Sequence, residues 1–289
     1  MILEDFLTLW IDTYIKPKRT ENTLRAYRFA LAHLSPEILA NELAAITPID
    51  LQREINELAA TFSRQAQIMF CALRQAFKRA MRLHMIEHSP MEAVDPPPHE
   101  TAEAETFTSE EAAAYLEAAR QQQHGRLLIL MLCLGLRRNE ARGLTSDDLD
   151  SSGILHVRHQ RTKTGLAPLK TRSSRRDIPV PEALRSLFDR PDGEYLDDVS
   201  ENGLRRAHLA AMAAAKIYRH VTLHGLRHTC ATLAIENGQQ PTTVQKLLGH
   251  RHFTTTADFY VHPDQRLLTI CTAVLYNQIA RFGARLEIV

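Results

Sequence analysis

The chain has 289 residues, which is enough for two domains and a substantial core. Hydrophobic residues make up 44% of it, the usual share in a soluble globular protein. No apolar run approaches the ~18 residues of a transmembrane helix, so we expect no membrane span. The opening residues, MILEDFLTLW, lack a basic stretch ahead of an apolar core, so we also expect no signal peptide.

The net charge of +1 hides an uneven distribution. Residues 124–289 carry 23 Lys and Arg against 16 Asp and Glu, a net of +7, whereas residues 96–123 carry one against six. A basic second half is what a phosphate-binding surface requires. On charge alone, a solvated surface of mixed charge explains the numbers equally well.

Residues 1–95 have the patterns of a small helical bundle. Apolar spacing predicts a helix over 4–14, and Thr20 is a candidate N-cap for the next one. Thr47-Pro48 opens a third helix, and Ser63 precedes a long fourth one. The segment 94–100 then holds three consecutive prolines and leads into the acidic stretch TAEAET. Proline cannot continue a helix, so we predict an extended linker over 96–105.

Residues 106–289 form the second predicted domain. The run 108–111, Thr-Ser-Glu-Glu, is a helix-start signal, and a buried helix is expected over 127–136. Alternating residues in 153–180 predict two or three short antiparallel strands, and helical patterning continues from Pro181 to the end. We expect the four cysteines to be buried small apolar side chains rather than zinc ligands, because they are far apart and form no CxxC pair. They are Cys71, Cys133, Cys230 and Cys271.

Two cationic motifs lie in the first half of this domain. Arg137 follows the buried helix and the helix-breaking Gly135, with Glu140 three residues on. An arginine there can present its fork to a phosphate, and a surface Arg/Glu pair is the plain alternative. Lys170 lies in a predicted turn dense in cations, with Lys163 as a rival in the same region. A solvated basic hairpin explains both lysines as well.

The stretch from residue 224 to 260 contains the remaining candidates. His224 and Arg227 are three residues apart and share one helix face. His250 follows a Leu-Gly helix end, and Tyr260 comes ten residues later. His228 is expected to face another direction. A cation, two imidazoles and a phenol favour a phosphate site with a nucleophile, although each residue taken alone has a structural explanation.

With these motifs in order, the chain resembles the tyrosine recombinases, the family of phage integrases and Xer-like enzymes that exchange DNA strands. Gly-Leu-Arg-Arg-x-Glu corresponds to the family's first arginine, Arg137, with its companion Glu140. The hairpin Lys-Thr-x-Ser-Ser-Arg-Arg-x-Ile-Pro corresponds to the family's lysine at Lys170, and Lys163 lies too far upstream to match. Three further motifs, His-x-Leu-Arg-His, Leu-Leu-Gly-His and Thr-Thr-x-x-x-Tyr, supply the other four family positions. These are His224, Arg227, His250 and Tyr260.

The resemblance implies a mainly α protein of the integrase type. A helical, SAM-like core-binding domain would span 1–95. A mostly α catalytic domain with a small antiparallel sheet and a C-terminal docking helix would span 106–289. In that helix an apolar stripe packs either on its own domain or on a neighbouring protomer. Helix N-termini suggest further DNA contacts in the first domain. The residues are Thr20, Thr23, Arg25 and Arg64.

The resemblance also implies site-specific recombination without a metal or other cofactor. Tyr260 would attack a phosphodiester and form a 3′-phosphotyrosyl link. Arg137 and Arg227 would clamp the phosphate, His224 would act as base and Lys170 as acid, and His250 would bind the phosphate or position the tyrosine.

The partners implied are double-stranded recombination sites and, in the synaptic complex, three further copies around two duplexes. Each protomer would be a monomer when free. An accessory directionality factor would be a further partner. The protein, encoded by a bacterium or by a phage, would act in the cytoplasm at the nucleoid. Two rival interpretations are a type IB topoisomerase-like enzyme and a DNA-binding regulator without catalysis. The helical first domain and the complete set of six residues favour the recombinase.

Overall fold

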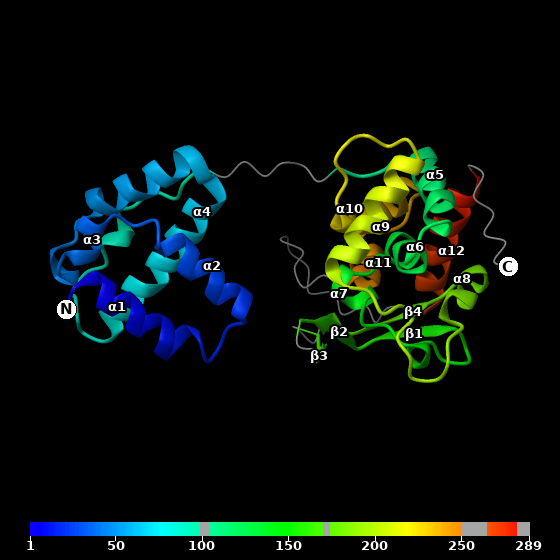
Figure 1. Cartoon of the computed structure of the whole chain (residues 1–289), viewed down its shortest axis with the longest axis horizontal. Coiled ribbons are helices and arrows are strands. Elements are labelled where there is room, and N and C mark those ends of the chain that lie inside the picture. Colours follow the sequence, from blue (N-terminus) through cyan, green and yellow to red (C-terminus); the bar gives the residue numbers. More distant parts are fainter. Residues whose placement is uncertain (99–104, 164, 170–173, 250–264, 282–289) are drawn as a thin grey trace. The chain divides into compact units, whose positions relative to one another are not determined.

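The computed structural model describes residues 1–98, 105–163, 165–169, 174–249 and 265–281. The chain divides into two compact units, Met1–Ala102 and Glu103–Val289 (Figure 1). Over the described ranges it is mainly helical with two small antiparallel sheets, which confirms the predicted fold class. No described helix has both the length and the apolar character needed to cross a bilayer. The predicted linker falls mostly on 99–104, outside the described residues, so the proposed domain bounds stay predictions.

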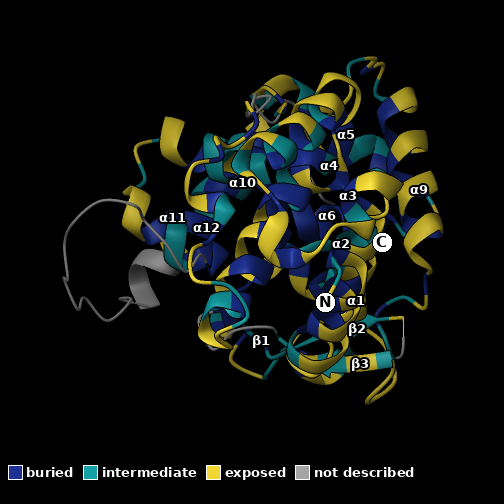
Figure 2. Cartoon of the chain, turned by 90° about the vertical axis from the view of Figure 1, so that its left-hand side faces the viewer, coloured by how far each residue is buried: buried dark blue, intermediate teal, exposed yellow. Residues whose placement is uncertain are grey.

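The first unit is a helical bundle around one apolar core. Its most deeply buried side chains include Trp10, Leu51, Ile55, Leu73 and Phe77, none more than 2% exposed. In Figure 2 such positions are dark blue and the solvent-facing sides of the helices yellow. The helices are α1 (Leu3–Trp10), which continues as a π-helical turn (Ile11–Ile15), α2 (Glu21–Leu31), α3 (Pro36–Ala40) and α4 (Pro48–Arg82), with two short 3₁₀ turns (Leu43–Ala45, Pro90–Glu92).

Helix α4 joins two predicted helices into one of 35 residues. Thr47 caps its start, accepting a hydrogen bond from Asp50 N at 3.3 Å, as its place before Pro48 predicted. The predicted second start at Ser63 is confirmed as a kink: Phe62 leaves helical geometry, at φ −134° and ψ 69°, and a second helical segment begins directly after it. The Ser63 hydroxyl donates to the carbonyl of Pro98 at 3.3 Å instead of capping a helix.

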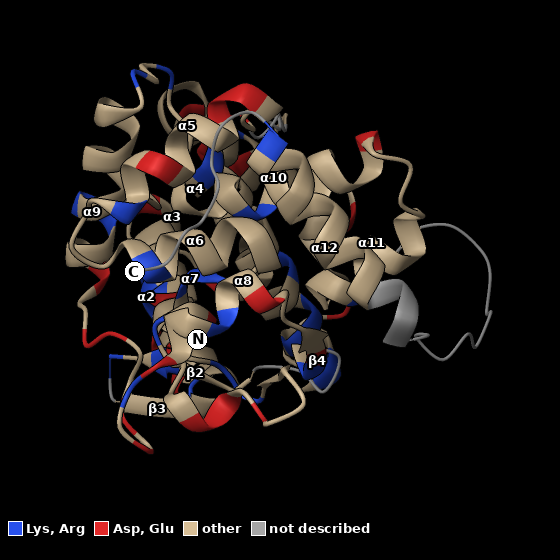
Figure 3. Ribbon diagram, turned by 90° about the vertical axis from the view of Figure 1, so that its right-hand side faces the viewer, with Lys and Arg blue, Asp and Glu red and all other residues tan. Residues whose placement is uncertain are grey.

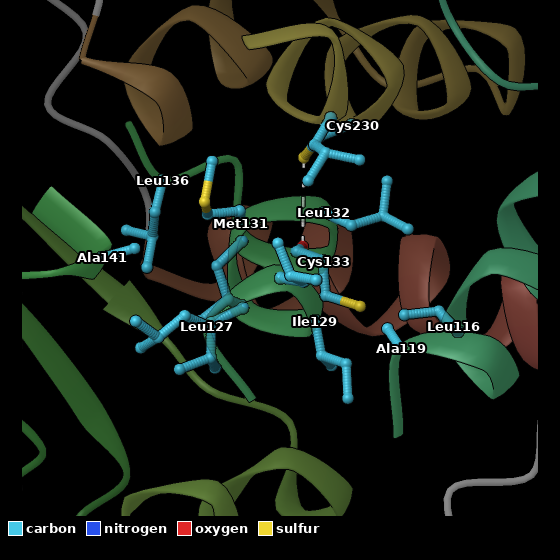
Figure 4. Close-up of a cluster of buried hydrophobic side chains, with 14 of the residues drawn as sticks. Leu116, Ala119, Leu127, Ile129, Met131, Leu132, Cys133, Leu136, Ala141 and Cys230 are labelled. Atoms are coloured by element: carbon cyan, nitrogen blue, oxygen red, sulfur yellow. Dashed lines mark hydrogen bonds between the residues drawn. The ribbon is translucent and has the colours of Figure 1, made fainter. Parts of the chain in front are cut away.

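The second unit is built around helix α6 (Gly125–Leu134). All of its residues except Arg126 are buried. Figure 4 shows its side chains projecting in several directions into the core, with Cys230 of a neighbouring helix above Cys133. Helix α5 (Ser109–Arg120) begins with the predicted capping box, in which Glu111 N donates to Thr108 Oγ1 at 3.2 Å. Two short elements follow α6: α7 (Arg138–Ala141) and a 3₁₀ turn (Ser146–Asp148).

Among the described residues, four strands rather than two or three form the predicted antiparallel region. β1 (Ile154–Val157) pairs with β4 (Arg176–Pro179), and β2 (His159–Thr162) pairs with β3 (Gly165–Pro168). These are two separate two-stranded sheets. The remaining elements are α8 (Glu182–Arg185), a 3₁₀ turn (Ser186–Phe188), α9 (Glu201–Ala214), α10 (Leu223–Glu236), α11 (Pro241–Leu248) and α12 (Gln265–Arg281).

Helix α12 packs on its own unit. Cys271, Leu275 and Ile279 are fully buried, and the helix contacts α5, α6, α10, α11 and β4. Thr272 Oγ1 donates to the carbonyl of Pro179 at 3.0 Å, which ties the helix to the end of β4. In the described part of the tail, Cys271, Leu275 and Ile279 therefore cover the core of their own unit, whereas Ile270 of the predicted stripe is 49% exposed.

The prediction for the cysteines holds for three of the four. Cys133, Cys230 and Cys271 are buried, and burial raises the pKa of Cys133 to about 12 and of Cys271 to about 11. They behave as inert apolar side chains at neutral pH. The prediction is wrong for Cys71, which lies on the exposed face of α4.

Candidate active site

Gly135 places Arg137 at the turn between α6 and α7. Gly135 ends α6 in the left-handed conformation, at φ 63°, where a residue with a side chain is strained. A Cβ atom at this position would also lie 2.3 Å from Leu248 Cδ2. Glycine therefore lets the end of α6 approach the end of α11, and the chain then leaves the core at Arg137.

Glu140 holds Arg137 from the first turn of α7. Arg137 donates from Nη1 to Glu140 Oε1 at 2.7 Å and from its backbone N–H to Oε2 at 2.9 Å. The Glu140 side chain is only 2% exposed, and that of Arg137 is 34% exposed. Burial by itself would raise the pKa of Glu140, but Arg176 and Arg137 lower it to about 2. Because Glu140 is buried, the alternative of a surface Arg/Glu pair is excluded.

Arg227 is almost completely buried on α10, with 2% exposed. It donates to the carbonyl of Gly135 at 2.6 Å and to that of Leu248. Burial first, and then the charges of Arg137 and Arg176, lower the pKa of Arg227 to about 9, which leaves it cationic at neutral pH.

The two arginines meet at the C-terminal end of α11. Arg137 Nη2 donates to the carbonyl of Gly249 at 3.1 Å, next to the carbonyl that Arg227 contacts. Carbonyl groups at a helix C-terminus carry partial negative charge, so they stabilise both cations before any ligand binds. The structure thus brings together Arg137 and Glu140, from the start of α7, and Arg227, from α10.

His224 lies one turn before Arg227 at the start of α10, as their spacing predicted. Thr222 caps this helix by accepting a hydrogen bond from Gly225 N at 3.0 Å. His224 is exposed as a residue, but partial desolvation of its ring, followed by the charges of His228 and the nearby arginines, lowers its pKa to about 4. The imidazole is therefore neutral at pH 7 and has a lone pair available for a proton.

The prediction that His228 faces another direction is wrong. The rings of His224 and His228 pack edge to face, with centroids 4.6 Å apart. Residues four apart on a helix are neighbours on its surface, so the sequence spacing already contained this contact.

Three of the six predicted catalytic residues fall outside the described part of the chain. They are Lys170, His250 and Tyr260. The rival lysine, Lys163, is described and lies exposed at the turn between β2 and β3.

The predicted DNA contacts of the first unit lie at its surface. Thr20 stands at the N-cap of α2, but its hydroxyl contacts that of Thr23 at 3.2 Å and caps no backbone N–H. Arg25 donates to Asn22 Oδ1 at 3.0 Å. Arg64 donates to Gln67 Oε1 at 3.1 Å, in the first turn after the kink of α4 at Phe62.

A basic pocket in the same unit was missed by the sequence reasoning. It has a volume of about 500 Å³ and lies between the end of the π-helical turn and the last turns of α4. Arg79 also stacks on the Tyr14 ring at 4.3 Å. The sequence feature that could have predicted this pocket is the absence of any Asp or Glu between Leu58 and Ile86. Five cations line the pocket: Lys18, Arg19, Lys78, Arg79 and Arg82.

Arg176 was also missed as a member of the active-site cluster. It lies on β4, in a region rich in Lys and Arg near the label β4 in Figure 3, and its Nη2 donates to Glu140 Oε2 at 2.8 Å. The sequence feature that could have identified Arg176 is its place in Arg-Arg-x-Ile-Pro. Side chains alternate between the two faces of a strand, so one of two adjacent arginines points inward.

Comparisons with known proteins identify the family. Residues 105–266 match the phage integrase family, and residues 2–59 match the phage integrase N-terminal SAM-like domain. The tyrosine recombinase XerC of Pseudomonas syringae pv. syringae is 28% identical over 284 residues, covering 90% of this chain and 93% of that protein. XerC of Pelobacter propionicus is 26% identical over 270 residues, covering 86% and 87%.

Solved structures share the fold. The Tn1549 transposon integrase in complex with transposon right end DNA has a TM-score of 0.70 at 21% identity, covering 98% of this chain and all of that one. A lambda integrase tetramer bound to a Holliday junction has a TM-score of 0.66 at 18% identity, covering 89% and 80%. The matched family spans more than half of the sequence. The chain therefore belongs to the phage integrase family and is a site-specific tyrosine recombinase, an enzyme that cuts and rejoins DNA.

Proposed function

We propose that Tyr260 is the nucleophile of this recombinase and that the arginine cluster binds the scissile phosphate. The tyrosine oxygen attacks phosphorus, the bond from phosphorus to the 5′-oxygen breaks, and a 3′-phosphotyrosyl link and a free 5′-hydroxyl result. The 5′-hydroxyl of the partner strand then reverses the step and rejoins the DNA. The convergence of Arg137 and Arg227 at the end of α11, one residue before His250, is the observation that carries this proposal.

The two arginines suit the charge that develops during the reaction. As tyrosine attacks, negative charge grows on the non-bridging oxygens of the phosphate. Arg137 and Arg227 are held by Glu140 and by main-chain carbonyls before DNA arrives, so little reorganisation is needed when that charge appears. His250 is proposed to hydrogen-bond the same phosphate or to position Tyr260.

Proton transfer is assigned to His224 and Lys170. His224 accepts the tyrosine proton, since it is neutral in the free protein. A bound phosphate adds negative charge beside it, which favours the imidazolium and raises its pKa toward neutrality. Lys170 donates a proton to the departing 5′-oxygen, so that a hydroxyl rather than an alkoxide leaves.

We further propose that the basic pocket of the first unit contacts the DNA backbone, along with Thr20, Thr23, Arg25 and Arg64. Its cations would neutralise phosphates and position the unit without reading sequence. The assembly is proposed to be a tetramer on two duplexes, formed from free monomers with help from an accessory directionality factor. The DNA-bound lambda integrase tetramer supports the tetramer. Its place of action is proposed to be the bacterial nucleoid.

Trapping the covalent intermediate tests the chemistry. Wild type is mixed with a duplex of its recombination site that carries a nick near the cleavage position, so that the cleaved fragment diffuses away. We expect a denaturation-resistant protein–DNA adduct, and no adduct with Tyr260→Phe. A wild type that binds the site but never forms the adduct would be a DNA-binding regulator instead. Relaxation of supercoiled plasmid without joined recombinant strands would indicate a topoisomerase.

A further inference from the structure

Arg176 is a buried cation that the proposed reaction has not used. Its side chain is 6% exposed, and it enters the arginine cluster from β4. Nη2 donates to Glu140 Oε2 at 2.8 Å and Nη1 to the carbonyl of Ser174 at 3.1 Å. Its Nε atom is buried and has no hydrogen-bond partner among the described residues. A buried guanidinium with an unsatisfied N–H is costly, so a compensating role is expected.

The Glu140 carboxylate is shared between two arginines of different exposure. Oε1 accepts from Arg137 Nη1, while Oε2 accepts from Arg176 Nη2 and from the backbone N–H of Arg137. Arg137 is one-third exposed, but Arg176 is fixed by the strand that carries it. Arg176 therefore sets the orientation of the carboxylate, and the carboxylate in turn orients the Arg137 guanidinium.

The charge balance of the cluster also supports a role for Arg176 in phosphate binding. Three arginines, Arg137, Arg176 and Arg227, surround one carboxylate, which leaves an excess of positive charge where the phosphate is proposed to bind. Coulomb repulsion from Arg176 is among the causes that lower the pKa of Arg227, so the two cations lie close together. An incoming phosphate relieves this repulsion, and the relief adds to its binding.

We propose that Arg176 is a positioning residue for DNA cleavage, which acts through Glu140 to hold the Arg137 guanidinium in place for the scissile phosphate. The inference rests on the proposed function, because it takes Arg137 to be a phosphate ligand. Arg176 itself need not touch the DNA. A small displacement of a catalytic group costs about a hundredfold in rate, so losing this support is expected to reduce the cleavage rate far more than DNA affinity.

The test measures single-turnover adduct formation on the nicked duplex at saturating protein. Arg176→Met is expected to slow adduct formation about 10- to 100-fold. Arg176→Lys retains a charged donor for Glu140 and should keep more of the rate. The matched control is Arg142→Met, because Arg142 and Arg176 are each 8% exposed as whole residues and Arg142 donates to the carbonyl of Val199 rather than to Glu140. The control should lose a similar amount of thermal stability and keep its cleavage rate.

Two modified substrates separate the routes by which Arg176 could act. A methylphosphonate at the scissile position carries no negative charge and depends less on Arg137, so the defect of Arg176→Met should shrink on it. A 5′-bridging phosphorothiolate has a leaving group that needs no proton, so the defect should persist if Arg176 acts on Arg137. Complete rescue by the phosphorothiolate would overturn the inference in favour of a route through Lys170.

The outcomes also separate this inference from the proposed function. If wild type forms no adduct, the proposed function fails. If wild type forms the adduct and both Arg176 variants cleave as fast as Arg142→Met, only the role of Arg176 is refuted. Loss of folding in Arg176→Met leaves Arg176→Lys to decide between these results.

Discussion

His208 is a buried imidazole whose protonation state the structure fixes. Its Nε2 lies 2.8 Å from the carbonyl of Val221, and its Nδ1 lies 2.8 Å from the hydroxyl of Tyr115. A carbonyl only accepts, so Nε2 carries the hydrogen and Nδ1 accepts from the tyrosine. Burial lowers the pKa of His208 below the usual 6.5, and the side chain is neutral in the folded protein.

We therefore predict that the second unit loses stability on acidification. The unfolded chain binds a proton at His208 more readily than the folded one, so the free energy of unfolding falls as pH drops below about 6.5. His224 and His228, whose pKa values are also lowered, contribute with the same sign, whereas His156 and His159, whose pKa values are raised by Asp177 and Asp148, contribute with the opposite sign. Urea unfolding at pH 7.5 and pH 5 measures the effect.

Two variants assign the pH dependence. His208→Gln should make the pH dependence less steep, because one of the titrating groups is gone. Tyr115→Phe should lower stability at both pH values but retain the slope, because it removes a hydrogen bond and leaves the imidazole buried. An unchanged slope in His208→Gln would show that other groups dominate the acid transition.

At the level of elements, the junction of α6 and α11 depends on Gly135. An alanine there adopts a left-handed conformation at a cost of about 1–2 kcal/mol. The contact with Leu248 adds about 1–3 kcal/mol of overpacking. We predict that Gly135→Ala destabilises the second unit by the sum of the two effects. It should also slow adduct formation, because the Gly135 carbonyl holds Arg227.

Gly238→Ala is the control for backbone strain. Gly238 also has a positive φ, 78°, but no described atom lies within 4 Å of an added Cβ. It should therefore show the conformational cost without the steric one, and normal cleavage. Equal unfolding energies and equal cleavage rates in the two variants would mean that packing against Leu248 contributes nothing.

The sequence predicted those parts of the site that a single element defines. His224 and Arg227 share a helix face because they are three apart, and Gly135 marks a helix end by its own chemistry. Arg176 and Glu140 are 36 residues apart and meet only when the folded chain brings β4 and α7 within reach of one side-chain hydrogen bond. Local patterns do not encode that encounter.

At the level of the whole molecule, charge is segregated along the chain, and the net charge of +1 conceals it. The first half of α4 carries Asp50, Glu54 and Glu57, while its second half carries only cations. Phosphate contacts release counterions from DNA, so affinity falls with salt at a log–log slope of about 0.9 per contact. The basic pocket should therefore be visible in the salt dependence of DNA binding.

We predict that the double variant Lys78→Ala, Arg82→Ala lowers this slope by about 1.8, as the loss of two phosphate contacts requires. Binding to the recombination site and to unrelated DNA should weaken by the same factor, because phosphate contacts carry no sequence information. Arg53→Ala, an exposed arginine in the acidic half of the same helix, is the matched control and should leave the slope unchanged. The slope is measured by fluorescence anisotropy titrations at salt concentrations from about 50 to 300 mM, a range that includes physiological ionic strength. An unaltered slope in the double variant would place the DNA on another face of the first unit.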